Sequence, residues 1–109
     1  MITASIKMYG RPEKRKEIIQ TIKGLSSQIR QGEQCMNVSV YQDINDENVF
    51  YLVEEWKNEK ALKSHFNSEY YAALLGAGIL LKSPPQVKCM VNKGPECCNL
   101  REDDIPSIN

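Results

Sequence analysis

The residues best suited to chemistry lie between Phe50 and Val91. Glu54 and Trp56 come at the end of an expected strand, and the only histidine, His65, lies on the helix that follows. An imidazole changes charge near neutral pH, so it can accept a proton from a phenol or quinol. A carboxylate beside it can orient the ring, and an indole offers a flat apolar wall. We therefore predict a proton-transfer site with His65 as the base and Glu54 as its partner.

Each of these residues also has a purely structural interpretation. His65 would then be a core histidine held by one hydrogen bond, and Glu54 would form a hydrogen bond or ion pair at an interface. Trp56 would be an ordinary core aromatic. Glu55 points to the opposite face of the strand, so a register shift of one residue would exchange the two carboxylates.

Further residues are candidates for the walls of the pocket. One of the adjacent residues Tyr70 and Tyr71 must face inward, and helical spacing favours Tyr70. Asn37 belongs to a polar strand face that either lines the pocket or faces solvent. The predicted substrate contacts are Trp56, Tyr70, Phe66, Asn37 and Leu74.

Strands and helices alternate in a recognisable order around these residues. Alternating apolar side chains predict strands over residues 2–9, 35–42, 49–56 and 86–92. Helical spacing predicts helices over residues 12–31 and 59–66, and a further segment that Ser68 caps. The order βαββαβ indicates an α+β, ferredoxin-like fold, in which an antiparallel four-stranded sheet carries its helices on one face.

The third predicted strand, residues 49–56, is apolar on both of its faces. The helices can cover only one face of the sheet, so the other face needs a different cover. We therefore predict a homodimer in which two sheets pack face to face. The apolar residues in question are Phe50 and Leu52 on one face and Val49, Tyr51 and Val53 on the other.

The βαββαβ order, the segment FYLVEEW and the segment ALKSHFNSEYYAALL resemble the antibiotic biosynthesis monooxygenase family over about residues 1–92. Members of that family form dimeric α/β barrels. The resemblance implies oxidation of a quinol, phenol or polycyclic aromatic by dioxygen, without metal, flavin or another cofactor. Glu54, Trp56 and His65 match the family pattern. Tyr70 stands where quinol-oxidising relatives often carry a second histidine.

The heme-degrading branch of the same family is a poorer match. That branch pairs an asparagine of the first strand with a tryptophan and a heme-ligating histidine of the second helical region. Here the first strand offers only Thr3 and Ser5, and no histidine follows Tyr70. We therefore do not expect heme degradation.

Composition limits the remaining possibilities. The 109 residues suit one domain, assigned to residues 1–93, with an extended or partly disordered tail over residues 94–109. The 14 basic and 14 acidic residues cancel, so no nucleic acid partner is expected. No apolar run approaches the roughly 20 residues of a membrane helix. One histidine and four scattered cysteines give no metal-ligand spacing.

We expect a cytoplasmic protein, because no secretory leader is visible and the cysteines form no disulfide framework. Two alternatives to an enzyme remain open. One is a non-catalytic dimeric barrel that binds a small hydrophobic ligand, which the missing second histidine favours. The other is a redox sensor that uses the adjacent Cys97 and Cys98 of the tail.

Overall fold

The computed structural model describes residues 1–32 and 35–91, and every structural statement below concerns these residues. Four strands form one antiparallel sheet in the order β2-β3-β1-β4. The strands are β1 (Ile2–Tyr9), β2 (Cys35–Gln42), β3 (Val49–Trp56) and β4 (Gln86–Val91). The predicted tail over residues 94–109, with Cys97 and Cys98, lies outside the described residues, as does Asn92 at the end of the last predicted strand.

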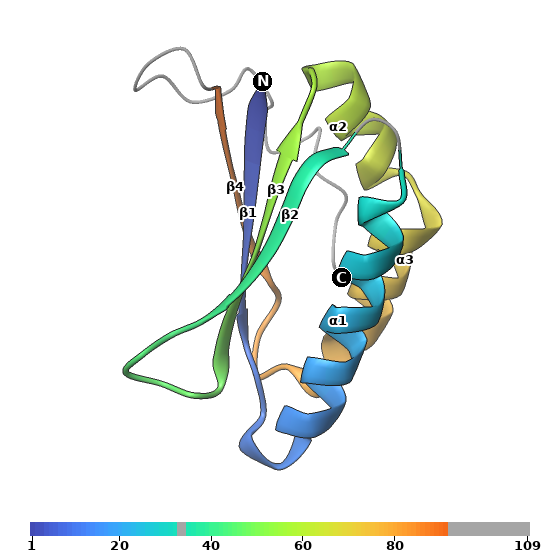
Figure 1. Ribbon diagram of the computed structural model, residues 1–109. Coiled ribbons are helices and arrows are strands. Elements are labelled where there is room, and N and C mark those ends of the chain that lie inside the picture. The colour runs from blue at the N-terminus through green and yellow to red at the C-terminus, as the bar shows by residue number, and fades with distance from the viewer. Residues whose placement is uncertain (33–34, 92–109) are drawn as a thin grey trace.

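The helices lie together on one face of this sheet (Figure 1). They are α1 (Arg15–Arg30), α2 (Glu59–Phe66) and α3 (Glu69–Gly76), with short 3-10 turns η1 (Pro12–Lys14) and η2 (Ala77–Leu80). The predicted ferredoxin-like βαββαβ arrangement is therefore confirmed. None of these helices is long and apolar enough to span a bilayer.

Side-chain caps begin the two short helices that surround the site. The Asn58 side chain accepts a hydrogen bond from the Ala61 backbone N–H at 2.9 Å, so α2 begins where Asn58 predicts. The Ser68 hydroxyl accepts a hydrogen bond from the Tyr71 backbone N–H at 3.4 Å and caps α3 in the same way. These caps set which residues of each helix point toward the sheet.

The strand register aligns inward-facing residues in rows across the sheet. Glu54 on β3 pairs with Val38 on β2 and with Ala4 on β1, and Ala4 pairs in turn with Cys89 on β4. Trp56 lies in the adjacent row, nearer the end of the sheet that α2 covers. These two rows form the floor of the candidate site.

Two details differ from prediction. The buried tyrosine of α3 is Tyr71, which is 1% exposed, whereas Tyr70 is 40% exposed. The choice of Tyr70 was wrong because helical spacing allows either tyrosine to share a face with Leu74, and the buried residues of α3 are Tyr71 and Leu74. The alternation of β2 also fails near its start. A register irregularity between Cys35 and Asn37 leaves Met36 exposed, whereas regular alternation along the strand would place it on the same face as the buried Val38.

The sheet face away from the helices has no cover within the described chain (Figure 1). Tyr51 and Val53 of β3 are only partly exposed there, while Tyr41 and Met90 of the outer strands are exposed. The Lys7 ammonium lies 4.9 Å from the Tyr9 ring centroid and 5.4 Å from that of Tyr51. Side-chain hydrogen bonding with Tyr9, and next with Tyr51, raises the pKa of Lys7 above its ordinary value.

Candidate active site

Glu54 is the centre of the candidate site. Its carboxylate is fully buried on β3, between an indole and an imidazole. Trp56 Nε1 donates a hydrogen bond to Glu54 Oε1 at 3.1 Å, and His65 Nε2 lies 3.1 Å from Glu54 Oε2. The second contact is within ion-pair distance but lacks hydrogen-bond geometry, so Oε2 has no aligned donor. The acid, the base and the indole that the sequence singled out are therefore in direct contact.

His65 reaches this carboxylate because α2 is short and fixed at both ends. The buried face of the helix consists of Ala61, Leu62, His65 and Phe66, so the imidazole points to the sheet and is only 6% exposed. At the C-terminal end, the Ser68 hydroxyl donates a hydrogen bond to the His65 carbonyl oxygen at 2.6 Å. Ser68 thus joins the end of α2 to the start of α3.

Aromatic rings hold the imidazole from several sides. The Trp56 and His65 rings are stacked, with centroids 4.5 Å apart and an angle of 29° between their planes. Tyr71 meets His65 edge-on at 5.9 Å, and Phe66 lies at 6.1 Å. In this orientation of the imidazole, Nε2 faces Glu54. Nδ1 is therefore the nitrogen left to act on a ligand.

A groove of about 160 Å³ opens beside this cluster. Trp56 and His65 form part of its wall, and Tyr70 contributes to it from α3. For comparison, an engineered apolar cavity of about 150 Å³ holds one benzene molecule. The groove therefore matches one aromatic ring in size. Its other lining residues are Ile29, Gly32, Ala61, Ser64 and Ser68.

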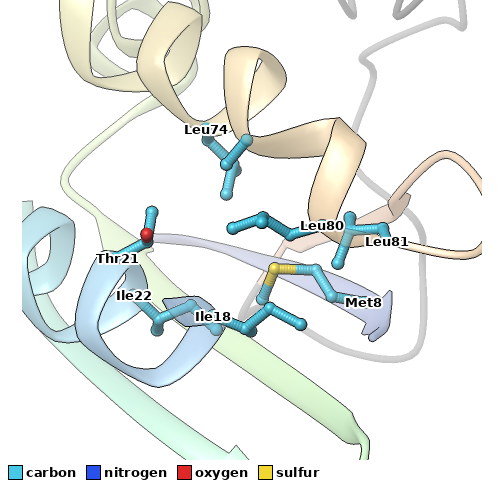
Figure 2. Close-up of a pocket in the computed structure, with 8 residues that line it drawn as sticks. Met8, Ile18, Thr21, Ile22, Leu74, Leu80 and Leu81 are labelled. Atoms are coloured by element: carbon cyan, nitrogen blue, oxygen red, sulfur yellow. The ribbon is translucent and has the colours of Figure 1, made fainter. Parts of the chain in front are cut away.

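Figure 2 shows a different hollow, which lies far from the acid and the base. Met8 lines it, and Met8 pairs with Phe50, whereas Trp56 pairs with Ile2 at the opposite end of β1. Its volume is about 10 Å³, too small for an aromatic ligand, and no acid or imidazole lines it. The groove beside His65 is therefore the better candidate site.

The structure brings together only some of the predicted contact residues. Glu54, Trp56 and His65 form the cluster, and Tyr70 lines the groove although it is not buried. The others do not line the groove: Phe66 and Leu74 are buried in the core, and Asn37 is exposed and pairs with Glu55 on the opposite sheet face.

Tyr71 is the residue that sequence reasoning assigned wrongly. The signal that identifies it is Ser68, because the residue three positions after an N-cap lies in the first turn and here faces the sheet. Burial and, to a lesser extent, the negative charge of Glu54 raise the pKa of Tyr71 to about 12. Its phenol therefore stays protonated at neutral pH and can only donate or accept a hydrogen bond. Its hydroxyl has no hydrogen-bond partner among the described residues.

Metal ligands are not clustered anywhere in the part of the chain that the structure describes: it contains no group of three or more His, Cys, Asp or Glu residues that could hold a metal ion.

Comparison with known proteins identifies the family. The model of the family described as antibiotic biosynthesis monooxygenase matches residues 1–76. This match covers most of the chain and includes Glu54, Trp56 and His65. The chain belongs to the antibiotic biosynthesis monooxygenase family.

Individual relatives are more distant. The chain is 29% identical over 85 residues to a protein of Bacillus subtilis (strain 168) named "Putative monooxygenase YcnE", which covers 78% of this chain and 90% of that protein. A crystal structure of an antibiotic biosynthesis monooxygenase has a TM-score of 0.79 at 20% identity and covers 86% of this chain and all of that one. A conserved protein from Methanosarcina mazei Go1 has a TM-score of 0.78 at 25% identity, covering 84% and 92% of the two chains. These structures support the fold, and the family match supports a monooxygenase-like function.

Proposed function

We propose that this protein is a cofactor-independent monooxygenase that oxidises a quinol or phenol of one ring with dioxygen. The observation that carries the proposal is the buried Glu54–His65 pair at the wall of a groove with the volume of one ring. Membership of the monooxygenase family supports the reaction class. The family resemblance also allows a polycyclic aromatic, which would extend beyond a groove of about 160 Å³.

The protein's part in this reaction is to make the substrate anion. His65 Nδ1 accepts a proton from a ring hydroxyl, and the Glu54 carboxylate stabilises the imidazolium through Nε2. The buried surroundings strengthen this attraction, because few water molecules screen it. The quinol anion then passes electrons to dioxygen. For a benzene-1,4-diol, one oxygen atom enters the ring and the other leaves as water, so that the diol and dioxygen give a hydroxyquinone and water.

Dioxygen uptake tests the proposal. Wild-type protein with benzene-1,4-diol should consume dioxygen faster than the buffer does, and His65→Ala should lose at least about 100-fold of this rate, the usual contribution of a general base. Naphthalene-1,4-diol, with two rings, should react more slowly than the one-ring diol. Equal uptake by wild type and His65→Ala would show that His65 is not the general base. Faster reaction of the two-ring diol would refute the proposed restriction to one-ring substrates.

A homodimer is the proposed assembly. The partly buried apolar residues Tyr51 and Val53 on the open sheet face support it, because a second sheet would cover them. Sedimentation velocity should give about twice the monomer mass, and a monomer would contradict the proposal.

A binding protein without catalysis is the second candidate. Tyr70 at the position of a second histidine supports it, since a site with one imidazole has only one group to move protons. Saturable binding of the one-ring diol without dioxygen uptake would favour this candidate.

The proposed location is the cytoplasm. Cys35 supports it, because its side chain is a thiol that forms no disulfide in the described chain, and a reducing compartment keeps thiols in that state. Fractionation of cells that express the protein tests this proposal, and recovery from the culture medium would contradict it.

A further inference from the structure

Tyr71 is a buried tyrosine whose hydroxyl lacks a partner. Its side chain is 1% exposed and meets the rings of His65 and Phe66 edge-on, at 5.9 Å and 5.0 Å. The hydroxyl has no hydrogen-bond partner among the described residues. A buried hydroxyl without a partner destabilises a protein, and a phenylalanine would make the same ring contacts without that cost. The hydroxyl therefore needs an explanation beyond packing.

The surroundings of the hydroxyl point to the carboxylate of Glu54. The charges of Glu54 on β3 and Cys89 on β4 both act on the Tyr71 phenol. These two residues flank Ala4 in one row of the sheet. The Tyr71 ring also lies 5.9 Å from the ring of His65, whose Nε2 is 3.1 Å from Glu54 Oε2. Glu54 Oε2 is itself a buried acceptor without an aligned donor. One unused donor and one unused acceptor thus lie in the same buried cluster.

We propose that Tyr71 is a positioning residue of the Glu54–His65 pair, whose hydroxyl donates a hydrogen bond to Glu54 Oε2 when a ligand occupies the groove. This inference rests on the proposed function. In unliganded sites such hydrogen bonds are often long or misaligned and tighten when the ligand binds. A donor on the carboxylate disfavours its protonation. The proton taken from the ligand therefore stays on the imidazole of His65 and does not pass to Glu54.

The test compares Tyr71→Phe with Tyr41→Phe, which removes the hydroxyl of an exposed tyrosine of β2 that does not line the groove. Tyr71→Phe should lower the rate of diol-dependent dioxygen uptake roughly tenfold, the effect of one hydrogen bond to a charged group. Its thermal unfolding midpoint should not fall and should rise by about 5 °C, because the unpaired hydroxyl is gone. Tyr41→Phe should change the uptake rate and the midpoint little. Tyr71→Phe with the uptake rate of Tyr41→Phe would overturn the proposal.

A second measurement is independent of turnover. The chain has one histidine, so ¹⁵N NMR of the labelled imidazole reports His65 alone. The titratable groups that surround Tyr71 are Glu54 on β3, His65 on α2 and Cys89 on β4. With phenol bound at neutral pH under nitrogen, which excludes turnover, the ring shifts should be those of an imidazolium in wild type and Tyr41→Phe.

In Tyr71→Phe these shifts should move toward the neutral imidazole, because Glu54 now shares the proton. Identical shifts in all three proteins would refute the role of Tyr71 even if wild type oxidised no diol. A missing uptake activity combined with the expected shifts would instead reject the monooxygenase proposal and keep the inference about Tyr71.

Discussion

Exchanging Glu54 for glutamine is the sharpest test of the candidate site. Glu54→Gln keeps the shape of the side chain and removes its charge, at a position that is fully buried against Trp56 and His65. The natural control is Glu55→Gln, one residue along the same strand. Glu55 points to the opposite face and is only partly buried, so the same chemical change is made away from the site.

The expected loss of stability follows from the hydrogen bond of the indole. A hydrogen bond to a charged acceptor contributes about 1.5–3 kcal/mol, and a neutral one about 0.5–1.5 kcal/mol. Trp56 Nε1 would donate to a neutral amide oxygen in Glu54→Gln, so this contact alone weakens by about 1 kcal/mol. Loss of the attraction to His65 adds to this, and we expect a total of about 2 kcal/mol. Glu55→Gln should stay within about 0.5 kcal/mol of wild type.

Urea denaturation followed by Trp56 fluorescence measures these differences, since Trp56 is the only tryptophan. Dioxygen uptake with benzene-1,4-diol measures activity, which should fall at least about 100-fold in Glu54→Gln and little in Glu55→Gln. Equal activity of the two variants would refute the role of Glu54 as the partner of the base. Equal stability would show that the contact with Trp56 contributes nothing measurable.

Three further predictions concern the rest of the molecule. The pKa of Tyr71 is about 12 in the folded protein against 10.0 ordinarily, so the unfolded chain loses this proton first as pH rises. Between about pH 10 and 12, wild type should therefore lose up to about 2.5 kcal/mol more unfolding free energy than Tyr71→Phe. Urea denaturation at each pH measures this difference, and an unfolding free energy that falls equally with pH in both proteins would contradict it. Burial raises the pKa of Cys35 to about 11 from 9.0, so less of it is the reactive thiolate at pH 8. Alkylation of Cys35 by iodoacetamide at pH 8 should therefore be about 100-fold slower in the folded protein than in urea. Peptide mass spectrometry follows the reaction, and similar rates in the two conditions would contradict the prediction. Val53→Asp places a charge on the open sheet face and should change the sedimenting species from dimer to monomer. Ile79→Asp, on the helix side, should leave the dimer intact. A dimer in both variants would show that the interface lies on another surface.

Much of the fold follows from local sequence patterns. Strict alternation in β1 and β3 predicts which residues face the helices, and Asn58 predicts the start of α2. These two features together place Glu54 and His65 on facing surfaces, so their contact was predictable. The wrong choice between Tyr70 and Tyr71 came from a spacing argument in which both residues can share a helical face with Leu74.

Other features depend on contacts between distant parts of the chain. The irregularity near the start of β2 is a property of its pairing with β3, and it leaves Met36 in solvent. The volume of the groove depends on how α1, α2 and α3 meet around Trp56, so the size of the groove could not be read from the sequence. Asn37 shows the same limit, since its side of the sheet was left open until the register was known.

Ser68 has a consequence for how this protein can diverge. Its hydroxyl donates to the His65 carbonyl oxygen and accepts from the Tyr71 backbone N–H, so it links the two aromatic residues nearest the carboxylate. Tyr70, the neighbour of Tyr71, points outward to the groove. In the proposed reaction, a residue that contacts the ligand and a residue that positions the proton-transfer pair are therefore neighbours on a single helical turn. Substitutions of Tyr70 during evolution would then change ligand selectivity and leave the buried contacts of Tyr71 in place.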